Sequence, residues 1–290
     1  MSIPMDSSCY LCHMRRNLET ARQHGDEKTA TAFAKDLMRL YLSLPETNSS
    51  PEMAPQVNAL LKQYYNLDPD RLKEEKVASN AFVMARLDKI RDMIASAPDP
   101  VYGALQAAVL GNYLDFAALQ GKVSFQQLDE MLEQALQLEL DRDCYQRLCG
   151  DLQTGKQLLI LTDNAGEVAI DRLLAETLAQ HYPHLQITFC VRGGPVYNDA
   201  TREDARDVGI TFPVIDSGVA IAGTAIHMLG EEALHALQNA DVVIAKGMGN
   251  TETMYGCGYN VYYAFLVKCS RFVEFFEKPM MTPLLIRDPK

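Results

Sequence analysis

The second half of this chain alternates short apolar segments with longer amphipathic ones, and this alternation restricts the fold more than any other feature. Leu158–Thr162, Ile187–Val191 and Asp241–Ala245 are mostly apolar and are bounded by polar residues or glycine. Such runs are typical of strands buried on both faces of a parallel sheet. Between them, Ile170–Tyr182 and Ala222–Leu237 have helical spacing. The pattern predicts an α/β fold with a mostly parallel, doubly wound sheet and helices on both faces.

The first half of the chain has a different hydrophobic pattern. Its apolar residues recur every three or four positions, for example over residues 33–41 and 128–136, which predicts helices. Glycine is scarce there, because 12 of the 17 glycines lie after residue 150, where loops between strands are expected. We therefore expect an all-helical N-terminal or cap domain over residues 1–152 and an α/β domain over residues 153–290, with one cleft between them.

Charge and composition exclude several classes of partner. The net charge is −11 and neither half is basic, which argues against nucleic acid as the main partner. No run of 18 apolar residues exists, so we expect no membrane span. The first residues lack the basic and apolar regions of a signal peptide, and the seven cysteines are irregularly spaced. Reduced thiols in a cytoplasmic protein are the interpretation that fits these features.

Polar residues gather in the loops that follow the predicted strands, where sites collect in open α/β sheets. The first such loop offers the side-chain oxygens of Asp163 and Asn164, followed by backbone N–H groups over Ala165–Glu167 at the start of a predicted helix. Hard oxygen ligands beside free N–H groups suit a divalent cation next to a phosphate. Taken alone, the same residues also fit an ordinary helix cap with a glycine turn.

Two further loops repeat this pattern. After the second strand, Arg192 and two glycines precede Asn198 and Asp199, although Asp199 alone also fits a helix cap. After the third strand, Lys246 opens a Gly-x-Gly-Asn loop that ends at Asn250, which places an ammonium group where a phosphate could bind. Three such loops in succession favour a combined metal and phosphate site more strongly than any one of them.

The motifs in these loops resemble those of the metal-dependent damage-control phosphatases, a family once described only as a domain of unknown function that includes the acidic-residue methyltransferase-like proteins. The resemblance rests on five motifs in the family's order: Gly111–Asp115, Asp163–Glu167, Asn198–Thr201, Lys246–Asn250 and Lys268–Cys269. A Cys-x-x-Cys pair at Cys9 and Cys12 is similar to the archaeal and bacterial branch. The chain departs from the family after Cys269, where the expected glycine-rich closing strand is missing, so the role of the last twenty residues stays open.

The resemblance implies a fold in which a helical domain joins an α/β domain, with the site between them. It further implies that Asp163, Asn164 and Asp199 hold a divalent metal ion, namely Mn, Ni, Co or Mg. Asp163, Asp199 and Lys246 are the catalytic residues that it implies. The residues expected to contact the substrate or its phosphate, or to line the cleft, are Glu167, Arg192, Asn198, Asn250, Lys268, Asn112 and Asp115. The implied partner is a small phosphorylated metabolite.

The residue types agree with this implication. Two carboxylates and an amide oxygen suit Mg²⁺ or Mn²⁺ better than Zn²⁺. None of the six histidines falls in the proposed loops, and there is no Gly-x-Ser-x-Gly motif, which weighs against a zinc hydrolase and a Ser-His-Asp triad. Lys268 is the weakest candidate, because a lysine at a strand end is more often a solvated edge residue than a ligand.

The Cys9 and Cys12 pair leaves two interpretations open. A structural zinc needs four ligands, and no second Cys-x-x-Cys exists, although Cys144 and Cys149 are available to complete a site. The alternative is a buried or lightly reactive pair of thiols.

The leading hypothesis is a metal-dependent phosphomonoester hydrolase that acts on sugar phosphates or on damaged cofactor or metabolite phosphates. One alternative is an S-adenosylmethionine-dependent carboxyl methyltransferase, but the Gly-x-Gly-x-Gly loop of such enzymes is missing. A haloacid-dehalogenase-type phosphatase needs Asp-x-Asp, and Ala165 occupies the third position. A non-catalytic, metal-dependent binding protein for small molecules remains as a third alternative.

Overall fold

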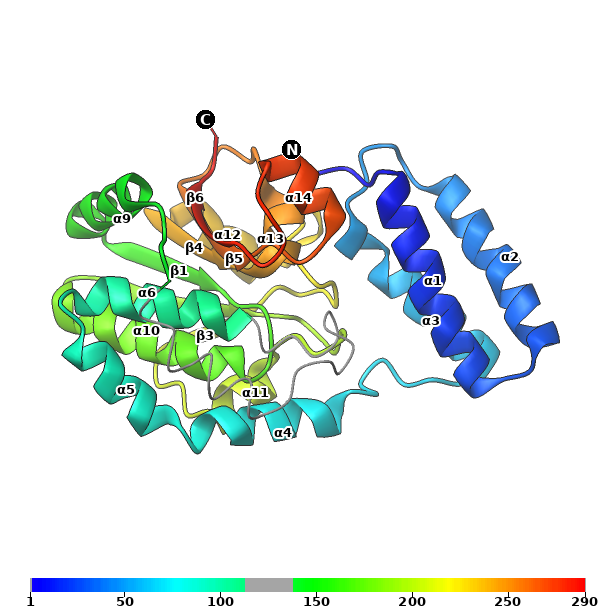
Figure 1. The fold of residues 1–290 in the computed structure, drawn as a ribbon, viewed down its shortest axis with the longest axis horizontal. Coiled ribbons are helices and arrows are strands. Elements are labelled where there is room, and N and C mark those ends of the chain that lie inside the picture. The colour runs from blue at the N-terminus through cyan, green and yellow to red at the C-terminus, as the bar shows by residue number, and fades with distance from the viewer. Residues whose placement is uncertain (1, 113–137, 290) are drawn as a thin grey trace.

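The computed structural model describes residues 2–112 and 138–289, which form a six-stranded sheet covered by helices and a lobe of helices at one end (Figure 1). The strands are β1 (Gln157–Leu161), β2 (Gln186–Val191), β3 (Val214–Asp216), β4 (Val242–Lys246), β5 (Val261–Leu266) and β6 (Pro283–Arg287). The sequence predictions for residues 128–136 and for Asp115 lie outside the described residues.

The sheet has the order β3-β2-β1-β4-β5-β6. Strands β1 to β5 are parallel and β6 pairs with β5 in the antiparallel direction. In the middle of the sheet, Ile160 of β1 lies between Phe189 of β2 and Ile244 of β4. The strand order reverses between β1 and β4, and at such a switch point the loops leave toward opposite faces and open a crevice. The predicted doubly wound α/β fold is confirmed.

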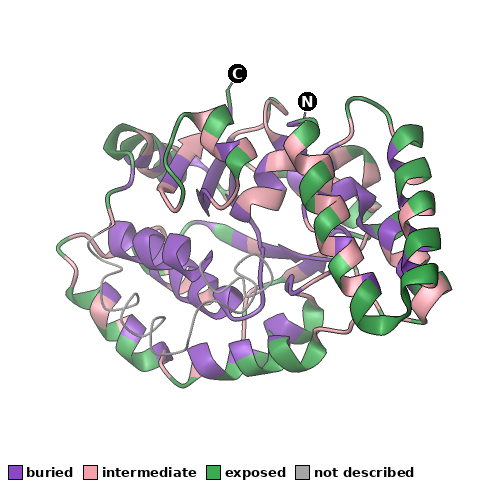
Figure 2. Ribbon diagram, turned by 45° about the vertical axis from the view of Figure 1, so that its right-hand side comes forward, coloured by how far each residue is buried: buried purple, intermediate pink, exposed green. Residues whose placement is uncertain are grey.

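Both faces of the sheet are buried, which explains why its strands are continuous apolar runs. Leu158 and Ile160 pack on one face with helices α4, α5, α6, α9 and α10, whereas Leu159 and Leu161 pack on the other with α12, α13 and α14. Figure 2 shows the burial of the strands and of the helices packed against them. The helices are α4 (Lys73–Met84), α5 (Leu87–Ser96), α6 (Pro100–Gly111), α9 (Arg142–Thr154), α10 (Glu167–His181), α11 (Arg202–Asp207), α12 (Glu231–Asn239), α13 (Gly247–Met254) and α14 (Ser270–Phe276).

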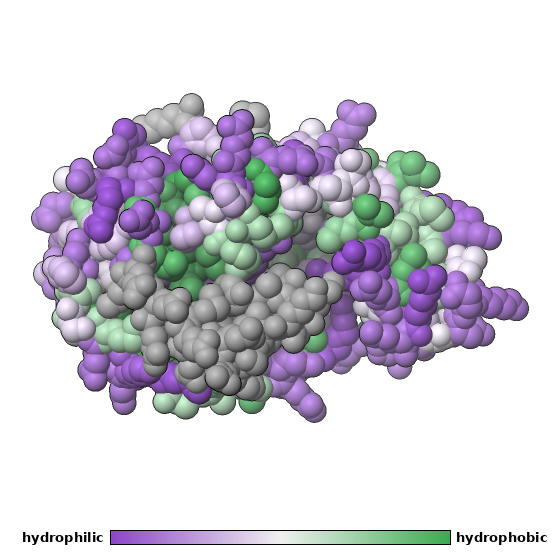
Figure 3. Space-filling model, viewed as in Figure 1, coloured by the Kyte–Doolittle hydropathy of each residue, from purple (hydrophilic) through white to green (hydrophobic). Residues whose placement is uncertain are grey.

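The N-terminal lobe has a small core of its own. It consists of α1 (Ser7–His24), α2 (Glu27–Ser43), the short 3-10 helix η1 (Ser50–Met53) and α3 (Ala54–Tyr65). Phe33, Leu37 and Leu61 form its centre. The lobe lies beside α14 and the end of the sheet, and a connecting segment leads from α3 to α4 (Figure 1). Figure 3 shows mostly hydrophilic residues along the outer edge of this lobe, at the right of the view.

The helical half of the chain is therefore divided between two cores. Helix α6 is buried along nearly its whole length and shares a core with the sheet, as do α4, α5 and α9. The boundary predicted between residues 152 and 153 falls inside α9, and it stays a prediction. No helix among the described residues has both the length and the apolar character needed to span a bilayer.

One predicted helix is shorter in the structure. Ala222–Leu237 contains only the 3-10 helix η4 (Ile226–Met228) and the first residues of α12, which starts at Glu231. The reason is a tight contact before η4: a Cβ atom on Gly223 would lie 2.5 Å from the carbonyl oxygen of Gly249. The Thr224 backbone N–H also donates to Thr253 Oγ1 at 2.7 Å. Contact with α13 therefore keeps this segment extended.

The C-terminal residues close the sheet without glycine. Residues 283–287 form β6, which pairs along β5 from Leu266 to Tyr262. Leu284 and Leu285 are buried. The glycine-rich closing strand expected from the resemblance is missing, and an apolar antiparallel strand forms this edge of the sheet instead.

Candidate functional site

The loops after β1 and β2 are held together by backbone hydrogen bonds. Ala165 N–H donates to Asn198 O at 2.8 Å, and Ala200 N–H donates to Asp163 O at 2.7 Å. Asn164 and Asp199 form an isolated antiparallel bridge between the two loops. The three residues that the sequence resemblance assigns to a metal, Asp163, Asn164 and Asp199, therefore lie together at the carboxyl end of the sheet, beside its switch point.

None of these three side chains is needed as a helix cap. Helix α10 starts after Gly166, which has no side-chain cap. Helix α11 is capped instead by Thr201 and Asp204 in a reciprocal pair of hydrogen bonds. The capping interpretation of Asp163, Asn164 and Asp199 is thus wrong. Two of the three N–H groups expected to be free after Asn164 are also taken, because Ala165 N–H donates to Asn198 O at 2.8 Å and Gly166 N–H donates to Asn80 Oδ1 at 2.6 Å.

Asp163 lies in a crowded acidic environment. Its Oδ2 accepts from Asn112 Nδ2 at 2.8 Å and from Asn164 Nδ2 at 2.9 Å, and its Oδ1 lies 3.4 Å from Arg192. Burial raises the pKa of Asp163 well above its usual value, and the charges of Asp199 and Glu167 act in the same direction. A bound cation would relieve this repulsion.

Arg192 joins the carboxylates to the rest of the site. Its Nε lies 2.6 Å from Asp199 Oδ2, and its Nη1 donates to Asn250 Oδ1 at 2.9 Å and to Gly223 O at 3.0 Å. The side chain is buried, with 2% of its surface exposed. Arg192 thus orients Asp199 and neutralises part of the acidic charge, and most of its donors are used within the protein.

Lys246 lies beneath the site and not at its surface. Its Nζ donates to Glu167 Oε1 at 2.5 Å, Asp171 Oδ1 at 2.7 Å and Ala108 O at 2.8 Å, and the side chain is fully buried. An ammonium has three donors, so none is left for a phosphate. The expected phosphate contact of Lys246 stays a prediction that this bonding does not support, because in the structure Lys246 holds Glu167. The two carboxylates raise the pKa of Lys246, whereas burial raises the pKa of Asp171 to about 7.

Glu167 and Asn250 are also anchors and not exposed ligands. Glu167 has no exposed surface, and its Oε2 accepts from Asn112 at 3.0 Å and from Asn164 at 2.9 Å. Asn250 is fully buried and donates to Lys246 O at 2.6 Å and Thr162 O at 3.0 Å. Direct phosphate contact by either side chain, which the sequence resemblance implied, does not fit this burial.

An open cavity of about 300 Å³ adjoins this network. Asp163, Asn164, Asn198, Asp199 and Lys268 line it, together with residues that sequence reasoning did not select. Lys268 Nζ also donates to Asn112 O. The added lining residues include His13, Arg16, Tyr197, Met248, Gly249, Glu252 and Arg271, and the Cys9 and Cys12 pair singled out in the sequence also lines the cavity. The N-terminal lobe therefore forms one wall of the cavity, and no local motif signals this.

The floor of the cavity also includes the start of α13. Lys246 precedes this helix without a side-chain cap, and among the described residues no acceptor is found for the N–H groups of Met248 and Gly249. Gly247 has φ +76°, and a Cβ atom there would lie 1.9 Å from Asp163 Oδ2. Asp163 therefore occupies space that only glycine leaves open, directly beside an uncapped helix N-terminus.

A divalent cation fits the donor set. Asn164 uses its amide N–H groups on Asp163 and Glu167, and no group in the described parts of the chain donates to its Oδ1. The site therefore offers two carboxylates and one amide oxygen, all hard donors that Mg²⁺ and Mn²⁺ prefer. The buried acidic cluster, with the raised pKa of Asp163, is the environment such an ion would stabilise.

The cysteine pair lines the cavity. Across residues 2–112 and 138–289, no group of three or more His, Cys, Asp or Glu side chains is arranged to hold a metal ion. Cys144 and Cys149 lie on α9 at the other end of the molecule (Figure 1), so they do not complete a site with Cys9. Burial raises the pKa of Cys9 to about 11, which keeps it a thiol at neutral pH.

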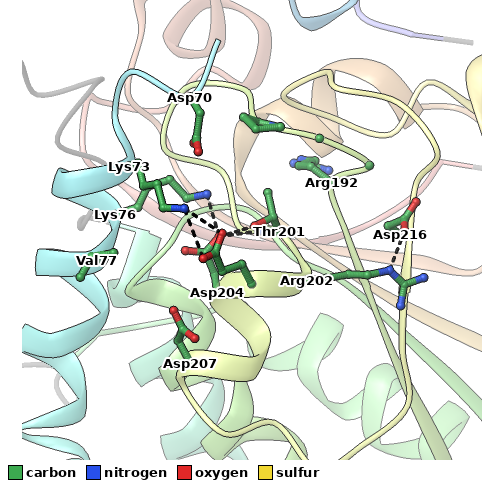
Figure 4. Close-up of a pocket in the computed structure, with 14 residues that line it drawn as sticks. Asp70, Lys73, Lys76, Val77, Arg192, Thr201, Arg202, Asp204, Asp207 and Asp216 are labelled. Atoms are coloured by element: carbon green, nitrogen blue, oxygen red, sulfur yellow. Dashed lines mark hydrogen bonds and ion pairs between the residues drawn. The ribbon is translucent and has the colours of Figure 1, made fainter. Parts of the chain in front are cut away.

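A second cavity, of about 240 Å³, borders the loop that follows Arg192 (Figure 4). Its charges are compensated internally. Lys76 Nζ lies 2.7 Å from Asp204 Oδ2, and Arg202 Nε lies 2.6 Å from Asp216 Oδ2. Because these cations already have carboxylate partners, this cavity is a poorer anion site than the first one.

Three comparisons with known proteins agree with one another. The family model of the damage-control phosphatase ARMT1-like domain matches residues 5–282. An uncharacterized protein of Methanocaldococcus jannaschii is 31% identical over 94% of this chain and 92% of its own length. A damage-control phosphatase of Archaeoglobus fulgidus is 31% identical over 64% of each chain. The crystal structure of a DUF89 family protein from Pyrococcus horikoshii has a TM-score of 0.82 at 23% identity and covers 99% of both chains.

Proposed function

Because the chain belongs to the family of damage-control phosphatases with an ARMT1-like domain, we propose that it is a metal-dependent phosphomonoester hydrolase for small metabolites such as sugar phosphates. Family membership supports the coarser part of this statement, a phosphatase role on phosphorylated metabolites. The proposed metal dependence rests on the chemistry of the donor set, and the proposed substrate class rests on the family resemblance. The observation that carries the proposal is that Asp163, Asn164 and Asp199 lie together on one side of an uncapped helix N-terminus.

In this proposal, Asp163, Asn164 and Asp199 hold Mn²⁺, Ni²⁺, Co²⁺ or Mg²⁺. When bound, such an ion would polarise a phosphoryl oxygen and would lower the pKa of a nearby water. The two carboxylates make the ligand set negatively charged, because the amide oxygen is neutral. A negatively charged ligand set favours a divalent cation over a monovalent one.

The protein also supplies groups that bind the phosphate. The N–H groups of Met248 and Gly249 open α13 beside Asp163, and a helix N-terminus is a ready anion site. Lys268 lines the same cavity and adds a positive charge. These groups replace Lys246 and the N–H groups after Asn164 in the phosphate-binding role.

In this proposal, the remaining polar residues of the site act by positioning the metal ligands. Arg192 orients Asp199, and the fully buried Lys246 holds Glu167, which in turn accepts from Asn112 and Asn164. Such a network fixes the ligands before substrate arrives, and preorganised electrostatics account for a large part of phosphoryl-transfer catalysis.

The test is turnover of a panel of sugar phosphates by protein stripped with a chelator and reloaded with each of the four metals. We expect hydrolysis with at least one metal, none in chelator, and loss of activity in Asp163→Ala and Asp199→Ala. Asp207→Ala removes an exposed carboxylate on α11 and is the matched control. No turnover with any metal would favour the binding-protein alternative. Normal turnover by Asp199→Ala would overturn the site assignment.

A further inference from the structure

One side of the cavity next to the proposed metal ligands carries polar side chains that the proposed chemistry does not use. His13 of α1, Ser50 of η1 and Glu252 of α13 all line this cavity, and each is partly exposed. These three residues are here called the polar row. Because they come from three separate elements, only the packing of the N-terminal lobe against α13 brings them to one cavity.

Contacts between the elements hold the polar row in place. His13 Nε2 and Ser50 Oγ lie 2.7 Å apart and share a hydrogen bond. The 3-10 helix η1, which contains Ser50, packs against α13. The Ser50 hydroxyl is not needed as a cap, because Ser49 and Glu52 cap η1 in a reciprocal pair of hydrogen bonds. Its remaining hydrogen-bonding capacity is therefore available to a ligand in the cavity.

Glu252 lies one turn along α13 from the proposed phosphate site. Met248, whose N–H group is assigned to the phosphate, precedes Glu252 by four positions, and both residues line the cavity. The rise between them is about 6 Å, and side chains at this spacing lie on the same face and point back toward the helix N-terminus. The Glu252 carboxyl group is thus placed beside the part of a substrate that directly follows its phosphate.

The polar row carries little charge at pH 7. Burial lowers the pKa of His13 to about 4, with the Arg16 charge as a second cause. Burial raises the pKa of Glu252 to about 8, although Ser50 and the charge of Arg271 oppose this shift. A neutral imidazole, a hydroxyl and a carboxylic acid each offer one donor and at least one acceptor. A hydroxyl group of a ligand offers the same combination, so the two sets are complementary.

Two cations that line the same cavity have partners of their own. Arg271 Nε lies 3.4 Å from Asp6 Oδ2, and the guanidinium carbon of Arg16 lies 3.9 Å from the ring centroid of Tyr197. A ligand that presents neutral hydroxyl groups to the polar row leaves both of these contacts intact.

We propose that the polar row is a specificity site that binds hydroxyl groups of the substrate close to the phosphate that is hydrolysed. This proposal rests on the proposed function, because it assigns the residues that select the substrate in the same cavity. The observation that carries it is that three hydrogen-bonding side chains from three elements line one cavity, one helical turn from the phosphate site. Phosphate esters of sugars and polyols are then preferred over phosphate esters of apolar alcohols.

Binding is measured by calorimetry with phosphonate isosteres, in which a CH₂ group replaces the bridging oxygen so that the ligand is not hydrolysed. The matched ligands are the isosteres of glucose 6-phosphate and of cyclohexylmethyl phosphate, which has a six-membered ring without hydroxyl groups. The protein is titrated both loaded with Mn²⁺ and in chelator. We expect the wild-type protein to bind the hydroxylated ligand at least about tenfold more tightly than the cyclohexyl ligand.

The variants Ser50→Ala and Glu252→Leu each remove a hydrogen-bonding group from the polar row. Each is expected to weaken binding of the hydroxylated ligand about tenfold and to change the affinity for the cyclohexyl ligand less than about twofold. Glu252→Gln keeps a neutral donor and acceptor and should retain most of the preference. Ser43→Ala and Glu274→Leu, at exposed positions on α2 and α14, are the matched controls. Thermal unfolding checks that the variants are folded.

Turnover gives a second measurement that a merely structural role would not produce. In the active enzyme, Ser50→Ala and Glu252→Leu should raise KM for glucose 6-phosphate and leave kcat and KM for cyclohexylmethyl phosphate nearly unchanged. A loss of stability alone would lower activity toward both esters alike.

No preference of the wild-type protein in either titration would overturn the proposal, as would equal losses for both ligands in folded Ser50→Ala and Glu252→Leu. These results are distinguishable from a failure of the proposed function. A protein that hydrolyses no phosphate ester with any metal contradicts the proposed function, yet the titration in chelator would still decide the role of the polar row.

Discussion

The cavity has two walls that are built in different ways. The wall at the strand ends rests on a buried and densely hydrogen-bonded network: Lys246 and Asn250 have no exposed surface, and Arg192 has 2%. The wall from α1 is half-buried and loosely bonded, with Arg16 held by its stacking on Tyr197. The first wall is suited to fixing a metal ion and a phosphate, and the second to contacting the variable part of a substrate.

The difference follows from how each wall is folded. Strand ends belong to the core of the sheet, so a polar residue there must find partners in the protein. The α1–α3 lobe has its own small core and meets the cavity at its edge. The proposed function thus places chemistry and recognition in separate structural units, and it predicts that substitutions in the two walls have different effects.

The largest effect is expected from Gly247→Ala. The added methyl group would collide with Asp163, and φ +76° is itself unfavourable for alanine. Displacing a ligand by about 1 Å costs on the order of a hundredfold in activity, so kcat should fall at least that much. Gly150→Ala, where no atom lies within 4 Å of the new methyl, is the control and should leave kcat unchanged. A similar kcat in both variants would contradict the assignment of Asp163 to the rigid wall.

Lys246→Met tests the buried network. Removing the ammonium leaves Glu167 and Asp171 buried together without a counter-charge, which typically costs about 3–5 kcal/mol of unfolding free energy. The thermal midpoint should fall by about 10 °C. Adding Glu167→Gln and Asp171→Asn removes the stranded charges and should restore part of the loss. Lys73→Met, an exposed lysine on α4, is the control. No difference between the two lysine variants would contradict the positioning role of Lys246.

The sequence predicted the wall at the strand ends better than the wall from α1. The parallel sheet and the strand-end loops were predictable because each strand is a short local run and its loop follows directly. The acceptors of Lys246 were not, since Ala108 is 138 positions away. Nor was the contribution of α1: Arg16 looks like any polar residue of a surface helix, and only the packing of the lobe brings it to Tyr197. The extended segment before α12 escaped prediction because contacts with α13 override its helical spacing.

The smallest effect concerns pH. The pKa of His13 is lowered from its usual value near 6.5 to about 4, so the unfolded chain binds a proton in this range that the folded chain does not. The contribution of His13 to stability is therefore fully present above pH 6.5 and is lost as the pH falls toward 4. His13→Asn should lessen the fall in thermal midpoint between pH 7 and pH 5 by about 2 °C. His24→Asn, an exposed histidine on the same helix, should leave the pH dependence unchanged. If both variants showed the same dependence of the thermal midpoint on pH, the α1 wall would be more hydrated than the burial of His13 indicates.

The central claim is that Asp163, Asn164 and Asp199 hold one divalent ion, and equilibrium titration with Mn²⁺ tests it most directly. The account predicts one Mn²⁺ per wild-type chain and at least tenfold weaker binding in folded Asp163→Asn and Asp199→Asn. Asp207→Asn should bind as the wild-type protein does. Wild-type protein that binds no Mn²⁺, Ni²⁺, Co²⁺ or Mg²⁺, or an Asp199→Asn variant with unchanged stoichiometry and affinity, would contradict it.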